Sequence, residues 1–279
     1  GWIWDDDHIR SLIDSVSMSY PIGAVMLLQT GGDGAKFQPR LIEGVDSSIN
    51  IKPDYLILDG QQRLTSMYLS LSSGKPVPTR TSKNQEIMRF YYLNMGKCLD
   101  PNADRLDAIV SVPVEKILTS DFGRKIDLDI STPEKEFQMG LFPLNAVFNT
   151  DLYNTWRRGY QGLFRLDDER YNLFDHFESE IIKRFQSYRV PVIELLRDTP
   201  KVAVCNVFEK VNTGGVTLTV FELVTAIFAA DNYNLRKDWE SRIDRIREQD
   251  VLKNVDATAF LTAVTLLTSY NHHNEDPDR

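Results

Sequence analysis

The chain has 279 residues, of which 42% are hydrophobic, and a formal net charge of −8. This composition suffices for one large domain or two modest ones, and it excludes a chain that is disordered throughout. The sequence pI of about 5.1 excludes a protein coated in positive charge for nucleic acid, although a local basic groove stays open.

The two cysteines, Cys98 and Cys205, are far apart, which gives neither a zinc-ligand spacing nor a disulfide framework. No apolar run approaches the roughly 18 residues of a membrane span, and no signal peptide is visible. We therefore expect a cytoplasmic protein with no membrane partner. Because residue 1 is Gly and the sequence ends in a polar tail, we also expect the natural protein to continue beyond Arg279.

The first predicted element is a helix, because apolar residues from Ile9 to Val16 recur with the spacing of one helix face. Acidic residues 5–7 suit its N-terminus, and Pro21 stops it. Strands are predicted at residues 22–29, 41–48, 54–59, 87–95 and 189–195. Further helices are predicted at residues 64–71, 144–160, 168–188, 199–211, 220–228, 236–249 and 256–270. Residues 100–140 carry many charges and a weak pattern, so we expect them on the surface.

A strand-to-helix junction carries the most unusual stretch, DGQQR, from Asp59 to Arg63. Asp59 is a good N-cap for the helix, and Gln62, three residues later, completes a capping-box-like pair. Gly60 lets the backbone approach a ligand closely, and the first amides of the helix form an anion site. The guanidinium of Arg63 suits a phosphate. A plain helix cap with an exposed arginine is the alternative.

The charge of Asp59 would repel a bare phosphate. Its carboxylate therefore either binds Mg²⁺ that accompanies phosphates, or holds Gln61, Arg63 or a ribose hydroxyl. Two adjacent glutamines serve no obvious packing purpose. Gln61 and Gln62 are therefore candidates for orienting an attacking water molecule.

A second polar loop follows the helix predicted at 199–211. It contains Asn212, Thr213, Gly214 and Gly215. Asparagine tolerates left-handed backbone, and the two glycines remove side-chain bulk. The loop is either a helix–turn–helix corner or a second ligand-facing loop.

The stretches 54–71 (DYLILDGQQRLTSMYLSL) and 207–227 (VFEKVNTGGVTLTVFELVTAI) together resemble the signature blocks of the DGQQR-motif family, domain of unknown function 262. This family forms the N-terminal part of GmrSD-like type IV restriction enzymes and related phage-defence proteins. The resemblance runs from about residue 2 to 240, and it is loose over 75–185. The family usually has arginine where this chain has Lys210, which keeps the charge and loses the bidentate grip.

The resemblance implies an α+β fold: a small mixed ParB/sulfiredoxin-like sheet with surrounding helices, followed by a helical C-terminal part. Residues 1–230 would form this domain, with a partly helical insertion at about 75–185, and residues 231–279 would begin a helical region. It also implies a nucleoside triphosphate and Mg²⁺ as cofactors. Asp59, Gln61, Gln62 and Arg63 would then be catalytic, with Asp59 also the metal ligand. Gly60, Lys210, Asn212, Thr213, Gly214 and Gly215 would bind the nucleotide.

The resulting hypothesis is a nucleotide-hydrolysing (NTPase) domain of a restriction system acting on modified or foreign DNA. The alternatives are a sensing module that binds a nucleotide or modified DNA without turnover, and a ParB-like nuclease core. An HNH-type nuclease pattern is not found around the four histidines, so a cutting domain is expected downstream or on a partner chain. DNA contacts are expected through the basic pairs Arg157–Arg158, Lys183–Arg184 and Arg236–Lys237, with Trp156, Tyr160 and Trp239 nearby.

Overall fold

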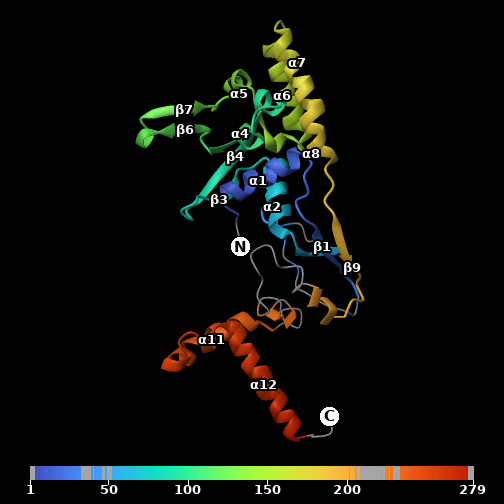
Figure 1. Cartoon of the computed structure of the whole chain (residues 1–279), viewed down its shortest axis with the longest axis vertical. Coiled ribbons are helices and arrows are strands. Elements are labelled where there is room, and N and C mark those ends of the chain that lie inside the picture. The colour runs from blue at the N-terminus through green and yellow to red at the C-terminus, as the bar shows by residue number, and fades with distance from the viewer. Residues whose placement is uncertain are drawn as a thin grey trace. The chain divides into compact units, whose positions relative to one another are not determined.

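The structure is a computed structural model of the chain (Figure 1). It describes residues 4–32, 39, 41–45, 48, 52–200, 202–204, 206–207, 221, 224–225, 227–228 and 233–275. The fold is α+β, as predicted, with small sheets accompanied by helices.

The chain forms two compact units. The first comprises residues 1–25, 42–48 and 60–192, and the second comprises residues 26–41, 49–59 and 193–279. The domain boundary expected after residue 230 stays a prediction.

The main sheet of the first unit is antiparallel. Its strands are β3 (Val77–Arg80), β4 (Glu86–Asn94), β5 (Ile109–Pro113) and β8 (Leu141–Pro143). The strand order is β3-β4-β5, and β8 pairs with β4, so that Tyr92 lies opposite both Val110 and Pro143. The aromatic run that predicted β4 forms the centre of the sheet, where Tyr91, Tyr92 and Leu93 are buried.

Helices cover this sheet. They are α1 (Asp6–Ser17), α2 (Gln61–Leu71), α3 (Met95–Leu99), α4 (Arg105–Ala108), α5 (Pro133–Met139), α6 (Thr150–Leu163), α7 (Asp168–Phe177) and α8 (Lys183–Ser187), with a π-helical turn at Glu178–Ile182 and a 3₁₀ turn at Leu144–Ala146. The predicted face of α1 is buried, and Asp5 caps it by accepting a hydrogen bond from the backbone amide of His8 at 2.8 Å. Phe142 and Trp156 pack edge to face in the core, with ring centroids 5.0 Å apart.

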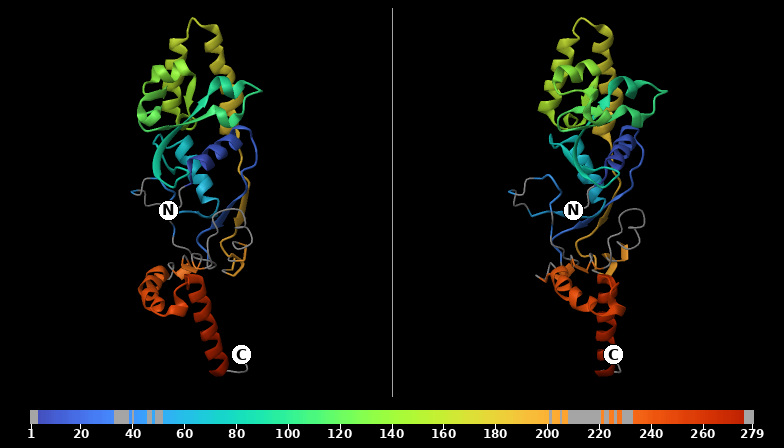
Figure 2. Two further views of the ribbon diagram at one scale, coloured as in Figure 1. Left: turned by 60° about the vertical axis from the view of Figure 1, so that its left-hand side comes forward. Right: turned by 90° about the vertical axis from the view of Figure 1, so that its left-hand side faces the viewer.

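Residues 100–140 do not lie wholly on the surface, so that expectation is wrong. Ile109, Val112, Ile130 and Phe137 belong to the core. Short elements, each contributing one or two apolar residues, build this part of the core, and no single one of them is long enough to show a period. The hairpin of β6 (Ile117–Ser120) and β7 (Lys125–Asp129), joined by the turn Asp121–Gly123, projects from the unit (Figures 1 and 2).

The second unit contains most of a three-stranded sheet of order β2-β1-β9. Its strands are β1 (Val25–Gln29), β2 (Tyr55–Asp59) and β9 (Val192–Leu195). The first residue of β1, Val25, and the first residue of β9, Val192, are assigned to the first unit. The strand predicted at 41–48 is absent from its described residues: 41–45 form an irregular turn in which Gly44 has a φ of +88°. Left-handed backbone of this kind interrupts a strand.

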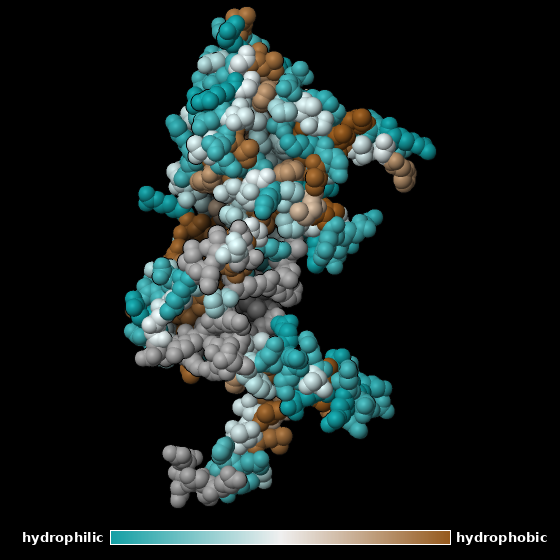
Figure 3. All heavy atoms as spheres, turned by 180° about the vertical axis from the view of Figure 1, so that it is seen from behind, coloured by the Kyte–Doolittle hydropathy of each residue, from teal (hydrophilic) through white to brown (hydrophobic). Residues whose placement is uncertain are grey.

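Helices α11 (Leu235–Arg247) and α12 (Ala257–Glu275) complete the described part of the second unit, with a 3₁₀ turn at Asp250–Leu252. Both helices were predicted. Apolar side chains are exposed on α12 (Figure 3), among them Val264, Leu266, Leu267 and Tyr270.

Candidate functional site

The DGQQR stretch lies where β2 ends and α2 begins, as predicted. Asp59 is the last residue of β2 and lies opposite Met26 of β1. Gly60 is the N-cap of α2, and its carbonyl accepts the first helical hydrogen bond, from the amide of Leu64 at 3.0 Å. The expectation that Asp59 caps the helix is therefore wrong, because the chain is still extended at that residue.

Gly60 has to be glycine at this position. Its φ is +86°, a left-handed conformation that L side chains rarely adopt. A Cβ atom on Gly60 would also lie 2.9 Å from Cγ2 of Val25. A glycine N-cap has no side chain, so the first amides of α2 are not capped by the side chain of the N-cap residue.

The side chain of Arg63 folds back onto the loop before β1. One guanidinium nitrogen, Nη1, donates a hydrogen bond to the carbonyl of Ile22 at 2.8 Å. A Cβ atom on Gly23 would lie only 2.3 Å from the same nitrogen, so Gly23 makes room for it. The alternative of a fully exposed arginine is thereby wrong, since Arg63 is half-buried and positions the start of α2.

Gly23 is a functional candidate that the sequence reasoning missed. Its φ is +88°, and it follows Pro21-Ile22 and lies two residues before the start of β1. A glycine between a proline and a strand was the available signal, because it often marks a turn or a close approach. The approaching group, a guanidinium from residue 63, could not be read from local sequence.

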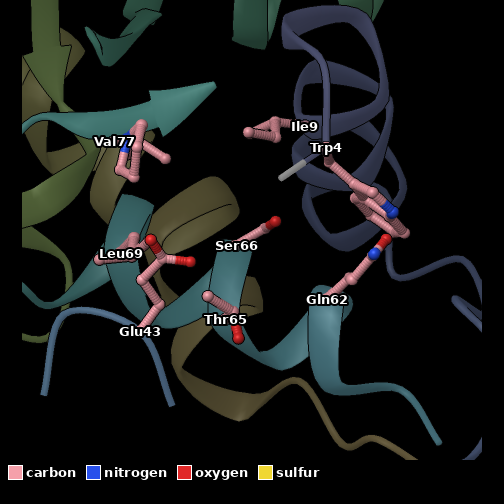
Figure 4. Close-up of a pocket in the computed structure, with 9 residues that line it drawn as sticks. Trp4, Ile9, Glu43, Gln62, Thr65, Ser66, Leu69 and Val77 are labelled. Carbon is pink, nitrogen blue, oxygen red and sulfur yellow. The ribbon is translucent and has the colours of Figure 1, made fainter. Parts of the chain in front are cut away.

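The two glutamines of the motif have different surroundings. Gln61 is exposed, whereas Gln62 is partly buried and lines a pocket beside α2 (Figure 4). The whole pocket lies in the first unit. Its lining comprises Trp4, Ile9, Glu43, Gln62, Thr65, Ser66, Leu69, Val77 and Pro78. Adjacent residues on a helix face different directions, so the two amides cannot serve one ligand atom in the same way.

The metal role expected for Asp59 stays a prediction. Within the described residues, no group of three or more His, Cys, Asp or Glu side chains could hold a metal ion. Mg²⁺ often needs only one or two carboxylates together with phosphate oxygens and water. The half-buried carboxylate of Asp59 offers such a ligand, although it also takes part in another interaction.

The second predicted loop lies outside the described residues. This applies to Lys210 and to the run from Asn212 to Gly215, and therefore to their expected role in nucleotide binding.

The basic pairs predicted to contact DNA are partly neutralised. Arg157 lies 3.5 Å from Glu178, and Arg184 lies 3.4 Å from Glu180. Trp156 and Tyr160, which were noted near these basic pairs, are buried in the core and so are not on a DNA-contacting surface. DNA contact through Arg158, Lys183, Arg236 and Lys237 stays a prediction.

Among the helices that the structure describes, none is both long enough and apolar enough to cross a membrane.

Comparison with known proteins identifies the family. Residues 1–229 match the N-terminal domain of the GmrSD restriction endonuclease. The chain is also similar to MJ0686, an uncharacterised protein of Methanocaldococcus jannaschii, with 26% identity over 281 residues. That match covers 95% of this chain and 44% of the relative, so the chain spans less than half of the relative's length. On the family match, which includes the DGQQR junction, the chain belongs to the family of GmrSD restriction endonuclease N-terminal domains.

Proposed function

We propose that this chain is the nucleotide-binding and nucleotide-hydrolysing domain of a restriction or phage-defence system that acts on modified or foreign DNA. The observation that carries the proposal is the DGQQR junction, where a left-handed glycine starts α2 without a side-chain cap. The family match supports the link to restriction. The nuclease itself would lie elsewhere in the whole protein or on a partner chain.

The start of α2 suits the phosphates of a nucleotide. Uncapped first-turn amides together with the helix dipole attract anions. The absence of a side chain at Gly60 lets a phosphate approach the backbone, and Arg63 adds a positive charge next to that turn. Bound Mg²⁺ would neutralise charge on the phosphates, and Asp59 is its candidate ligand.

Hydrolysis also needs a positioned water molecule. The exposed carboxamide of Gln61 has both a donor and an acceptor with which to orient it. Arg63 would stabilise charge that develops on the phosphates during cleavage. Fixing Arg63 to the carbonyl of Ile22 limits its motion, which reduces the cost of ordering it in the transition state.

Phosphate release tests this proposal. The purified chain is incubated with each nucleoside triphosphate and Mg²⁺, and the rates are compared with those of Asp59→Ala and Arg63→Ala. We expect the rate to fall at least about a hundredfold, the effect typical of losing one charge-stabilising group. Arg165→Ala, which removes an exposed arginine of the first unit, is the matched control and should keep the wild-type rate. Equal rates for all four proteins would defeat the proposal.

Two further experiments test the two alternative functions, calorimetry for the sensing module and a plasmid-nicking assay for the nuclease core. Tight binding of a triphosphate without any product would favour the sensing module that does not turn over. Nicking of plasmid DNA by this chain alone, with Mg²⁺ or Mn²⁺, would instead favour the ParB-like nuclease core.

A further inference from the structure

The pocket beside α2 combines an apolar floor with several polar groups. Ile9, Leu69 and Val77 supply apolar surface, while Gln62 comes from the first turn of α2 and Thr65 and Ser66 come from the next turn (Figure 4). The indole of Trp4 and the amide of Gln62 point toward each other at one end of the pocket, and Glu43 lies at the other end. An apolar wall with a few convergent polar groups is the usual character of a small-molecule site.

Several polar side chains of this pocket are not engaged by other groups of the protein. Within the described part of the chain, the side chains of Gln62, Thr65 and Ser66 form no hydrogen bond. Ser66 is only 5% exposed. One turn later, the equally buried Ser70 donates to the carbonyl of Ser66 at 2.6 Å. Because the Ser66 hydroxyl lines the pocket and has no described protein partner, a group that enters the pocket can hydrogen-bond with it.

The dimensions of the pocket limit what can enter. Its enclosed part has a volume of about 20 Å³, room for roughly one water molecule, while the space including its open mouth is about 280 Å³. Only the edge or one substituent of a ligand therefore reaches Ser66. The body of the ligand has to lie in the mouth, where Trp4 offers an aromatic face.

The residues that line the pocket suit a ligand with a flat ring whose edge carries hydrogen-bond donors and acceptors. Trp4 can stack on such a ring, and stacking on an aromatic side chain is worth about 1–3 kcal/mol per base. Glu43 only accepts hydrogen bonds, whereas the Gln62 amide and the Ser66 hydroxyl both donate and accept. Nucleobases present a π face together with an edge that carries both donors and acceptors.

The position of the pocket also fits a nucleotide. Gln61 starts α2, and Ser66 is five residues later, which corresponds to a distance of roughly 7.5 Å along the helix axis. Phosphates at the first turn and a base over Ser66 would therefore contact one helix, with the ribose between them. We propose that this pocket binds the base of the nucleoside triphosphate, with Trp4 stacking on the ring and with Gln62 and Ser66 hydrogen-bonding to its edge.

This inference rests on the proposed nucleotide site, and it changes the role of one motif residue. Gln62 becomes a base-contacting residue that sets nucleotide preference, and Gln61 alone is left to orient water. Trp4, 55 residues or more before the motif, is then a binding residue that the motif itself does not include.

The first test compares ligands with and without a base. Calorimetry with Mg²⁺ measures the Kd of each of the four nucleoside triphosphates and of inorganic tripolyphosphate, for the wild type and for Trp4→Ala and Ser66→Ala. We expect Trp4→Ala to raise the Kd of the nucleoside triphosphates about tenfold and to change the Kd of tripolyphosphate by no more than about twofold. Phe122→Ala, which removes a fully exposed aromatic ring, should change neither. Equal weakening of both ligand types, or no weakening of either, would overturn the inference while leaving nucleotide hydrolysis in place.

The second test does not depend on phosphates or turnover. The chain contains four tryptophans, which can be replaced by fluorotryptophan and followed by fluorine NMR, with the Trp4 signal assigned from Trp4→Phe. Adding a nucleoside should move the Trp4 signal and leave the signals of Trp156 and Trp239 in place. Such a movement in a protein that does not release phosphate would keep the pocket and reject the proposed hydrolysis. A Trp4 signal that does not respond to any of the four nucleosides would reject the pocket.

Discussion

Two polar clusters of the first unit differ in how well their hydrogen bonds are satisfied. On α5, the carboxylate of Glu136 accepts hydrogen bonds from Tyr92 at 2.8 Å, Lys116 at 2.8 Å and Trp156 at 3.0 Å. On α2, Gln62, Thr65 and Ser66 line a pocket and have no such partners among the described residues. Both clusters lie next to the core, so burial alone does not distinguish a structural site from a ligand site.

The difference teaches which polar groups belong to the fold. A charge as buried as Glu136 is tolerated because three donors compensate its loss of water. Burial and the neighbouring Glu136 carboxylate raise the pKa of Tyr92, which keeps its phenol protonated as a donor. The polar side chains of the α2 pocket have no such protein partners, as expected for a site whose hydrogen bonds are made by a ligand.

The largest expected effect comes from the satisfied cluster. Glu136→Ala should lower the free energy of unfolding by about 3–5 kcal/mol, because it leaves Tyr92 and Trp156 as buried donors without an acceptor. Urea denaturation measures the change. Glu134→Ala, an exposed glutamate in the first turn of the same helix, is the control and should cost less than about 1 kcal/mol. Similar losses for the two variants would remove the basis of the comparison.

The second effect concerns the glycine that opens α2. Gly60→Ala should cost about 2–3 kcal/mol, because alanine resists left-handed backbone and its Cβ would press on Val25. Gly162→Ala is a control for which the free energy of unfolding should change in the opposite direction. Gly162 lies in α6 with nothing within 4 Å of an added Cβ, so alanine there should stabilise the helix by about 0.5–1 kcal/mol. Thermal unfolding of both variants checks the signs, and a stable Gly60→Ala would show that the left-handed start of α2 is dispensable.

The sequence predicted the helices and strands of the first unit better than it predicted the side-chain contacts between them. Period and composition located α1, β4 and the DGQQR junction, because local residues determine those features. They could not reveal that Arg63 reaches the carbonyl of Ile22, or that Glu136 has three donors from separate elements. These are contacts between residues far apart in the chain. Asp59 was misjudged as the helix cap because strand pairing to Met26 keeps it extended, which a local capping rule does not include.

The third effect compares two serines on one helix. Ser66 and Ser70 are both buried on α2, but only the hydroxyl of Ser70 has a described partner. Ser66→Ala should leave the free energy of unfolding of the ligand-free chain nearly unchanged, because the removed hydroxyl faces the pocket and has no described partner to lose. Ser70→Ala loses a hydrogen bond and should be less stable than Ser66→Ala by about 1 kcal/mol. Urea denaturation of the pair cancels their shared gain in helix propensity, and equal stabilities would imply that Ser66 is satisfied after all.

The smallest effect tests ion pairing at a carboxylate that is much less buried than that of Glu136. Asp129, at the end of β7, accepts hydrogen bonds from Lys135 and Ser131, which lower its pKa to about 2. A lowered pKa in the folded state means that the charged carboxylate stabilises the protein above the ordinary aspartate pKa, and that this contribution is lost as the pH falls through about 2. Asp129→Asn should therefore change stability only slightly at neutral pH and should reduce the loss of stability between about pH 4 and pH 2. Urea midpoints measured across that range, with the exposed Asp151→Asn as control, check the sign. A wild-type pH profile in Asp129→Asn would mean that pairing at this partly exposed carboxylate contributes nothing measurable to stability, and that the stabilising effect of the Glu136 cluster depends on its deeper burial.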